Sequence, residues 1–199
     1  MSFAQDRQRL LDLLRELSFE RRKVILASGR ESDFYIDCKR TALTAEGHAL
    51  VGRCLYHQIA QLKPSVRAVG GLTLGADPLA SAIALTSFLE HEGGRAALRS
   101  GEAPPLFDAF IVRKEPKGHG TGQWIEGRTA LPDRSRVAVL EDVVTTGGSA
   151  LKAIERCRAE NLEVAACFAL VDRCEGGREA IVSAGVPLDA LFTREDFVP

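Results

Sequence analysis

Residues 139–150 read VLEDVVTTGGSA. The apolar start predicts the end of a buried strand, and two acids, Glu141 and Asp142, close that strand. The Thr-Thr-Gly-Gly-Ser run (145–149) then leads directly into a predicted helix. Glycines let the backbone turn sharply, and the amides at a helix N-terminus attract anions. The stretch therefore predicts a strand–loop–helix unit whose loop binds a phosphate ester.

The two acids need a separate explanation, because carboxylates repel a phosphate. Sugar hydroxyls, a magnesium ion or a positive charge that develops during a reaction would each suit them. A ligand with a phosphate at one end and a ribose beside it would satisfy both halves of the stretch. The alternative is an ordinary helix cap with two solvated acids beside it. Because the acids directly precede the loop, the pattern favours the ligand site.

Outward from this stretch, apolar strands alternate with amphipathic helices along the chain. Such alternation predicts an α/β fold with a mostly parallel central sheet flanked by helices. Ligands of these sheets bind beyond the carboxyl ends of the strands, which here means the loops after Gly70, Arg113, Asp142 and Asp172. The expected strands cover 66–71, 107–114, 136–142, 163–172 and 187–193, and the expected helices 6–17, 44–62, 77–90, 149–160 and 177–185.

Composition limits the class of protein. The chain has 199 residues, of which 45% are hydrophobic and 27% charged, and we expect one domain over 1–199. The net charge of −1 gives no indication of a nucleic-acid or membrane partner. Five cysteines without a CxxC pair indicate buried thiols in a reducing cytoplasm. The charged, amphipathic N-terminus is not typical of a secretory signal.

Two further loops carry candidate chemistry. GGLTLGADPLA (70–80) leads from a strand into a helix and could hold a second anion; a glycine-rich turn with Asp77 as the helix cap is the alternative. The loop 114–128, together with Arg113, contains several cations and four glycines. It could be a solvated charged loop, but the pattern favours a lid that closes over a polyphosphate, with His119 able to donate a proton.

Five segments together are similar to one protein family. VLEDVVTTGGSA resembles the phosphoribosyl diphosphate-binding signature of the type I phosphoribosyltransferases. Within that class, the other four segments resemble the orotate phosphoribosyltransferases, and the similarity runs from about Phe19 to the C-terminus. Those segments are ILASGRESDFYIDCK (25–39), GLTLGADPLA (71–80), VRKEPKGHGTG (112–122) and ALVDRCEGG (169–177).

The resemblance implies transfer of the 5-phosphoribosyl group from phosphoribosyl diphosphate to orotate, with Mg²⁺ held mainly by the diphosphate and water. It implies a cytoplasmic homodimer whose catalytic loop (114–128) is mobile and shared across the interface. It also implies an N-terminal hood, formed by about residues 1–40 and the C-terminal segment.

The resemblance also implies a role for each site residue. The 5′-phosphate would be held by Thr145, Thr146, Gly147, Gly148 and Ser149. The ribose and its developing charge would meet Glu141 and Asp142. The diphosphate would contact the loop 72–77, including Thr73 and Gly75, and would be covered by Arg113, Lys114, Lys117 and His119. Orotate would contact the hood residues Ser28, Gly29, Arg30, Phe34 and Tyr35, and would pair with Arg173.

Some alternatives stay open at this point. Arg173 could instead be a surface ion-pair partner of Glu175, and Phe34 and Tyr35 could be core aromatics. The chain has Ala27 where many relatives carry lysine, and the loop 72–77 has no lysine, so more of the diphosphate charge would fall to Mg²⁺ and the mobile loop. A phosphoribosyltransferase for another base and a phosphoribosyl diphosphate-sensing regulator that binds nucleic acid are the other interpretations. The cationic loop and Arg173 count against a purine base, and the near-neutral charge and the complete cationic loop count against the regulator.

Overall fold

A six-stranded sheet runs through the molecule in the order β5-β4-β3-β6-β7-β8. The structure is a computed structural model that describes residues 2–25, 31–97, 104–116 and 122–198. All neighbouring strands pair in parallel except β4 and β5, so the predicted mostly parallel α/β sheet is confirmed. The strands are β3 (Ala68–Leu72), β4 (Asp108–Val112), β5 (Ile125–Glu126), β6 (Arg136–Val144), β7 (Glu163–Asp172) and β8 (Leu188–Thr193).

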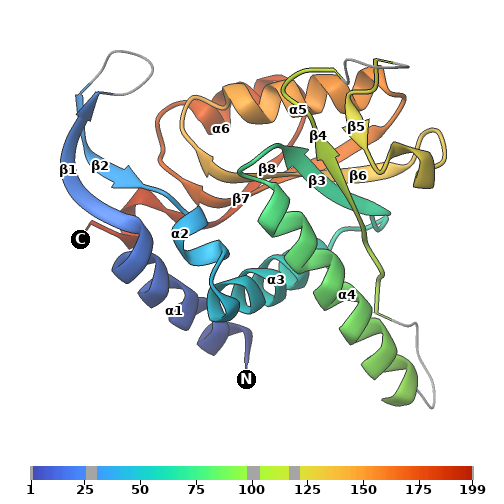
Figure 1. Cartoon of the computed structure of the whole chain (residues 1–199), viewed down its shortest axis with the longest axis horizontal. Coiled ribbons are helices and arrows are strands. Elements are labelled where there is room, and N and C mark those ends of the chain that lie inside the picture. Colours follow the sequence, from blue (N-terminus) through green and yellow to red (C-terminus); the bar gives the residue numbers. More distant parts are fainter. Residues whose placement is uncertain (1, 26–30, 98–103, 117–121, 199) are drawn as a thin grey trace.

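Helices cover both faces of this sheet. α5 (Gly148–Ala159) and α6 (Gly177–Ser183) lie on one side, and α3 (Ala45–Ile59) and α4 (Asp77–Ala97) on the other (Figure 1). A one-turn 3-10 helix, η2 (Arg128–Ala130), precedes β6.

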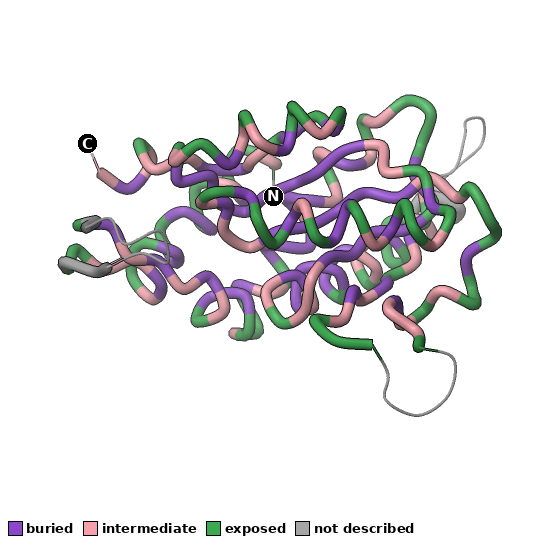
Figure 2. Tube along the Cα trace, turned by 90° about the horizontal axis from the view of Figure 1, so that it is seen from above, coloured by how far each residue is buried: buried purple, intermediate pink, exposed green. Residues whose placement is uncertain are grey.

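The central strand β6 shows why its sequence is apolar without alternation. Val137 and Val139 join the hydrophobic cluster beneath α5 and α6, whereas Ala138 and Leu140 join the cluster beneath α3 and α4. All four side chains are fully buried, and Figure 2 shows the strands as a buried layer between partly exposed helices. A strand buried on both faces needs apolar residues at every position.

The N-terminal part forms a separate hood beside the sheet. It consists of α1 (Phe3–Leu13), a single π-helical turn η1 (Leu14–Ser18), a hairpin of β1 (Phe19–Ile25) and β2 (Glu31–Ile36), and the short α2 (Lys39–Ala42). The hairpin is antiparallel and shares no strand pairing with the main sheet. In Figure 1 the C-terminus lies beside the base of this hairpin.

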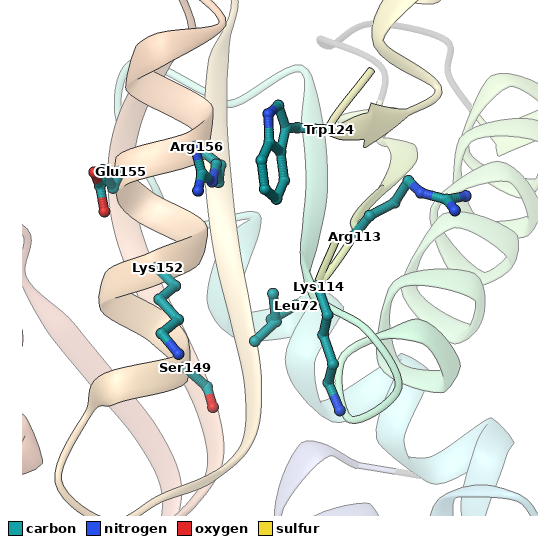
Figure 3. A pocket seen from close by; sticks show the side chains of 8 residues that line it. All are labelled: Leu72, Arg113, Lys114, Trp124, Ser149, Lys152, Glu155 and Arg156. Atoms are coloured by element: carbon teal, nitrogen blue, oxygen red, sulfur yellow. The ribbon is translucent and has the colours of Figure 1, made fainter. Parts of the chain in front are cut away.

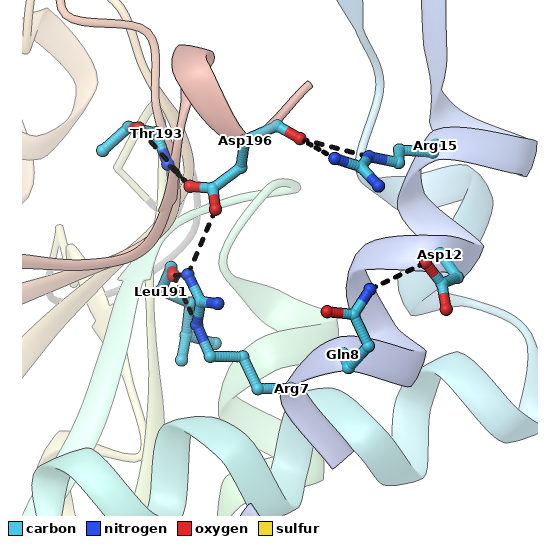
Figure 4. A network of polar contacts seen from close by, with 7 residues as sticks. All are labelled: Arg7, Gln8, Asp12, Arg15, Leu191, Thr193 and Asp196. Atoms are coloured by element: carbon cyan, nitrogen blue, oxygen red, sulfur yellow. Dashed lines mark hydrogen bonds and ion pairs between the residues drawn. The ribbon is translucent and has the colours of Figure 1, made fainter. Parts of the chain in front are cut away.

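The C-terminal 3-10 helix η3 (Arg194–Asp196) joins the hood to the sheet. Arg7 of α1 donates to the Leu191 carbonyl at 2.9 Å and pairs with Asp196 Oδ1 at 3.3 Å (Figure 4). Arg15 Nε donates to the Asp196 carbonyl at 3.1 Å. Phe197 packs between hood and sheet, with its ring 5.6 Å from Phe19 and 6.3 Å from Phe192. Chain segments at opposite ends of the sequence therefore build one unit.

Four expectations from sequence are wrong in detail. The acids do not end their strand, because β6 continues through Val144, which pairs with Asp172. The loop 114–128 is shorter than predicted, because Ile125 is fully buried and pairs with Val112 as part of β5. Asp77 is the first residue of α4 rather than its cap.

The fourth correction concerns the cysteines. Four thiols are buried as predicted, but Cys174 is exposed. It lies in the turn directly after β7 and has a φ of 57°, a left-handed backbone conformation that is typical of turns rather than of the core.

Candidate active site

The predicted site loops leave the sheet at one edge. Leu72 is paired with Val112 at the ends of β3 and β4, and Val144 is paired with Asp172 at the ends of β6 and β7. A hydrogen bond from the Arg173 amide to the Val144 carbonyl (2.9 Å) continues the pairing into the loops. The parallel register thus brings four loops that are distant in sequence to the same end of the sheet, as the topology predicts.

The loop 145–149 has the geometry of an anion site. Gly147 precedes α5 with a φ of 81°, and no side chain caps the helix amides. Thr146, Gly148 and Ser149 are exposed. Uncapped amides and hydroxyl donors at the start of a helix suit a phosphate.

The loop is supported from below by the start of α6. A Cβ on Gly177 would lie 2.5 Å from the Thr145 carbonyl oxygen, so only glycine allows this close approach. Gly177 was not among the predicted site residues. The Gly-Gly pair at 176–177 is the signal that could have indicated it.

The acid pair consists of two unlike carboxyl groups. Glu141 is 6% exposed, and its Oε2 has no hydrogen-bond partner. Burial raises the pKa of the Glu141 carboxyl to about 9, and the neighbouring Asp142 carboxylate adds to the rise. Glu141 is therefore protonated at neutral pH and Asp142 carries the negative charge of the pair.

Asp142 is fixed on three sides. Its Oδ1 accepts a hydrogen bond from the Val143 amide at 2.9 Å, and its Oδ2 lies 3.6 Å from the Lys39 ammonium. A Cβ on Gly75 would lie 2.4 Å from Asp142 Oδ1, so the loop after β3 packs directly against the carboxylate. The structure thus brings Gly75 and Asp142, both predicted site residues, into contact.

The loop 72–77 is held by its own side chains. Thr73 donates to Asp77 Oδ2 at 2.6 Å, and its amide donates to the Val112 carbonyl at 2.9 Å. Asp77 Oδ1 is buried without a hydrogen-bond partner, and Leu74 is 67% exposed. This loop contributes backbone and carboxylate groups but no cation.

The base of the cationic loop forms one wall of a groove of about 470 Å³ (Figure 3). Arg113 pairs with Glu126 at 2.9 Å, and its amide donates to the Trp124 carbonyl at 2.9 Å. The Arg156 guanidinium of α5 stacks 3.5 Å from the centre of the Trp124 ring. The groove is lined by Leu72, Arg113, Lys114, Trp124, Ser149, Lys152, Glu155 and Arg156.

Lysines flank the mouth of this groove. Lys114 and Lys152 both direct their ammonium groups toward the end at which Ser149 lies (Figure 3). Lys152 was not predicted from the sequence, although it stands one helical turn after Ser149 and long helical side chains lean toward the N-terminus.

Arg173 lies at the junction between sheet and hood. Its side chain is 7% exposed and pairs with Glu175 at 2.8 Å, so the predicted alternative of a Glu175 pair is present, but buried. The guanidinium carbon lies 5.3 Å from the centre of the Phe34 ring. Phe34 is itself fully buried among Phe19 and Phe197, as a core aromatic would be.

The remaining predicted residues divide into two groups. Tyr35 is half-buried, with the Arg22 guanidinium 3.9 Å from the centre of its ring, and it lies in the hood. Lys117 and His119, and also Ala27, Ser28, Gly29 and Arg30, lie outside the described residues.

Mg²⁺ would need oxygens from its ligand at this site. The described part of the chain holds no group of three or more His, Cys, Asp or Glu side chains that could enclose a metal. The buried, unpartnered Asp77 Oδ1 beside the loop 72–77 shows that a free acceptor oxygen is present there. A Mg²⁺ bound mainly through substrate oxygens and water fits this sparse set.

Comparisons with known proteins show the family of the chain. No protein-family model matches the chain. An orotate phosphoribosyltransferase of Sorangium cellulosum (strain So ce56) is 53% identical over 196 residues, which span 98% of this chain and 95% of the relative. One of Aquifex aeolicus (strain VF5) is 49% identical over 84% of this chain and 82% of the relative.

A solved structure shows that the similarity extends to the fold. The Mycobacterium tuberculosis H37Rv orotate phosphoribosyltransferase in complex with 5-phospho-alpha-D-ribosyl 1-diphosphate is 36% identical, with a TM-score of 0.72 over 96% of this chain and 98% of that one. The fold is thus that of the type I phosphoribosyltransferases, and the chain is a transferase of that class. It belongs to the orotate phosphoribosyltransferase family.

Proposed function

We propose that the chain transfers the 5-phosphoribosyl group from phosphoribosyl diphosphate to orotate, giving orotidine 5′-monophosphate and diphosphate in pyrimidine biosynthesis. The observation that carries this proposal is the contact between the loop 72–77 and Asp142 at the edge where the loop 145–149 also begins. A ligand with a phosphate, a ribose and a diphosphate in sequence needs those three groups side by side.

The loop and the acids would divide the sugar phosphate between them. The amides and hydroxyls of Thr145, Thr146, Gly147, Gly148 and Ser149 would bind the 5′-phosphate. Protonated Glu141 and ionised Asp142 would meet the ribose hydroxyls as donor and acceptor. When the bond from C1 to the diphosphate breaks, positive charge develops on the ribose, and the fixed Asp142 carboxylate stabilises it electrostatically.

The leaving diphosphate would be bound by the loop 72–77 and by cations from the loop after β4. Gly75 presents its backbone close to Asp142. Arg113 and Lys114 stand at the base of the lid, of which Lys117 and His119 would be part. His119 would supply a proton to the leaving group. Mg²⁺, when bound, would neutralise charge on the diphosphate.

Orotate would be recognised at the junction of sheet and hood. Its carboxylate suits the planar guanidinium of Arg173, which could exchange Glu175 for the substrate. Phe34 would support Arg173 from below, and Tyr35 would belong to the hood over the pyrimidine ring. The hood would comprise about residues 1–40 with the C-terminal segment, in a single domain over 1–199.

We also propose a homodimer in which each lid reaches the neighbouring site. Leu85, Phe88 and Leu89 are more than half exposed on one side of α4. Leu85 and Leu89 line a groove between α3 and α4. His48 lines both this groove and a second, largely apolar hollow at Leu74. The apolar surface therefore begins next to the loop 72–77. A second copy of the chain bound there would lie close to the site, as a dimer with shared sites requires.

A cytoplasmic location is proposed from the cysteines, since all five thiols are free. Among the described residues, no helix is both long and apolar enough to cross a bilayer.

The test is turnover of purified protein with Mg²⁺ and phosphoribosyl diphosphate. Loss of orotate absorbance is expected, and uracil, adenine and hypoxanthine serve as parallel controls. Reaction with another base in place of orotate would overturn the substrate assignment. Binding of phosphoribosyl diphosphate without reaction of any base would favour the regulator.

A further inference from the structure

Lys39 is a cation beside Asp142 that does not belong to any of the loops predicted to form the site. It is the first residue of α2, in the hood segment Ile-Asp-Cys-Lys (36–39) that links β2 to α2. Its ammonium lies 2.7 Å from Asp37 Oδ1 and 3.6 Å from Asp142 Oδ2. Lys39 therefore bridges a carboxylate of the hood segment and the acid of β6 that faces the ribose site.

Asp37 holds Lys39 in this position. Its Oδ1 accepts a hydrogen bond from the Lys39 backbone amide at 3.2 Å and also pairs with the side chain. Burial works against the charged ammonium, but Asp37 and Asp142 outweigh it, so the pKa of Lys39 is raised. The Lys39 ammonium is consequently charged at neutral pH.

The bridge matters because it holds the Oδ2 side of the Asp142 carboxylate. Val143 and Gly75 fix its Oδ1 side, and Glu141, its neighbour on β6, is buried and protonated. Within the described residues, Lys39 is the one cation within 4.0 Å of the Asp142 carboxylate. Loss of the ammonium would leave Oδ2 free to rotate away from the crevice.

We propose that Lys39 is a positioning residue for the transfer reaction: it holds the Asp142 carboxylate toward the ribose, and Asp37 holds Lys39. The inference rests on the proposed function. Lys39 acts through Asp142 and does not touch the reacting atoms, so its effect belongs to the chemical step rather than to substrate binding.

The test compares Lys39→Met and Lys39→Arg with wild type in steady-state turnover and thermal unfolding. Because the ion pair that orients Asp142 is lost, Lys39→Met is expected to lower kcat about 10-fold, with little change in KM or in the melting temperature. Lys39→Arg keeps the charge and should restore most of the rate. Lys63→Met, an exposed lysine before β3 at the opposite edge of the sheet, is the matched control.

A double-mutant cycle shows whether Lys39 acts through Asp142. In an Asp142→Asn background, Lys39→Met should cause no further loss of kcat. An equal loss in both backgrounds, a rise in KM for phosphoribosyl diphosphate alone, or no loss in wild type would each overturn the proposal. If wild type itself shows no turnover with orotate, the proposed function fails and this inference fails with it.

Discussion

At the scale of single residues, the acid pair shows how one strand gives two carboxyl groups different charges. Glu141 is buried and keeps its proton, whereas Asp142 is partly exposed and contacts Lys39 and Gly75. The sequence Glu-Asp does not reveal this difference. It arises because β6 continues past the acids and places them on opposite sides of the strand.

Glu141 should make stability depend on pH. Its pKa is about 9 in the folded protein against an ordinary value of 4.5, so between these values the folded state holds a proton that the unfolded chain has lost. The free energy of unfolding therefore falls as pH rises through this window. From about pH 6.5 to about pH 8.5, wild type should lose about 2 kcal/mol more than Glu141→Gln, whose side chain does not titrate.

Urea unfolding at both pH values measures this difference. Glu179→Gln, a change at an exposed glutamate on α6, should keep the pH dependence of wild type. Equal slopes for wild type and Glu141→Gln would show that Glu141 is ionised in the folded protein.

Gly75→Ala should impair catalysis more than folding. The new Cβ would lie 2.4 Å from Asp142 Oδ1, so either the loop or the carboxylate must move. Displacement of a catalytic group by about 1 Å costs about 100-fold in rate, so kcat/KM should fall by about that factor while the melting temperature changes little. Gly93→Ala is the control, because a Cβ there meets nothing within 4 Å. Wild-type activity in Gly75→Ala would argue against the close packing.

At the scale of elements, the loop 145–149 depends on the start of α6 as well as on α5. The Gly177 backbone contacts the Thr145 carbonyl, and Gly147 in turn packs on Gly177. The loop 145–149 is thus packed between two helices that follow adjacent strands. This arrangement keeps the helix amides aimed at one point without help from a side-chain cap.

Gly177→Ala should raise KM for phosphoribosyl diphosphate. A Cβ at this position would lie 2.5 Å from the Thr145 carbonyl oxygen and 2.5 Å from Val144 Cγ1, which pushes the loop away from its position. Loss of about one or two phosphate hydrogen bonds corresponds to about a 10-fold rise in KM. Initial rates at varied phosphoribosyl diphosphate measure it. A variant with lower kcat but unchanged KM would indicate that the loop does not bind the phosphate.

At the scale of the whole molecule, the chain ends and the outer face of α4 define two different contacts. The Arg7–Asp196 pair and Phe197 dock the hood on the sheet, so Arg173 and Phe34 meet at that junction. The second contact is the exposed apolar side of α4, a helix that begins at the end of the loop 72–77. We expect a second copy of the chain to cover it.

Leu89→Asp should convert the proposed dimer to a monomer. Leu89 is 61% exposed in the single chain, so the change costs little in folding but buries a charge in the proposed interface. Light scattering after gel filtration should show the mass halved, and kcat should fall about 10-fold or more if each lid serves its neighbour. Val182→Asp, at a 52% exposed residue of α6, should leave mass and kcat unchanged. An active monomer would contradict the shared lid.

The sequence by itself determined the main strands and helices and the parallel sheet, because apolar runs and helical spacing are local signals. Glycines and charges also indicated three candidate ligand loops, whereas the roles expected of Thr73 and Gly75 came from the resemblance to a family. The hairpin β1–β2 and the short β5 were not predicted, since their pairing partners decide them.

Only the tertiary structure decided the contacts that join distant segments. Lys39 reaches Asp142 across about half the chain, Gly177 supports Thr145, and Asp196 holds Arg7. It also decided which acid keeps its proton and that Phe34 is fully buried in the core beneath Arg173. These properties depend on burial and on distances between elements, which no local pattern of residues encodes.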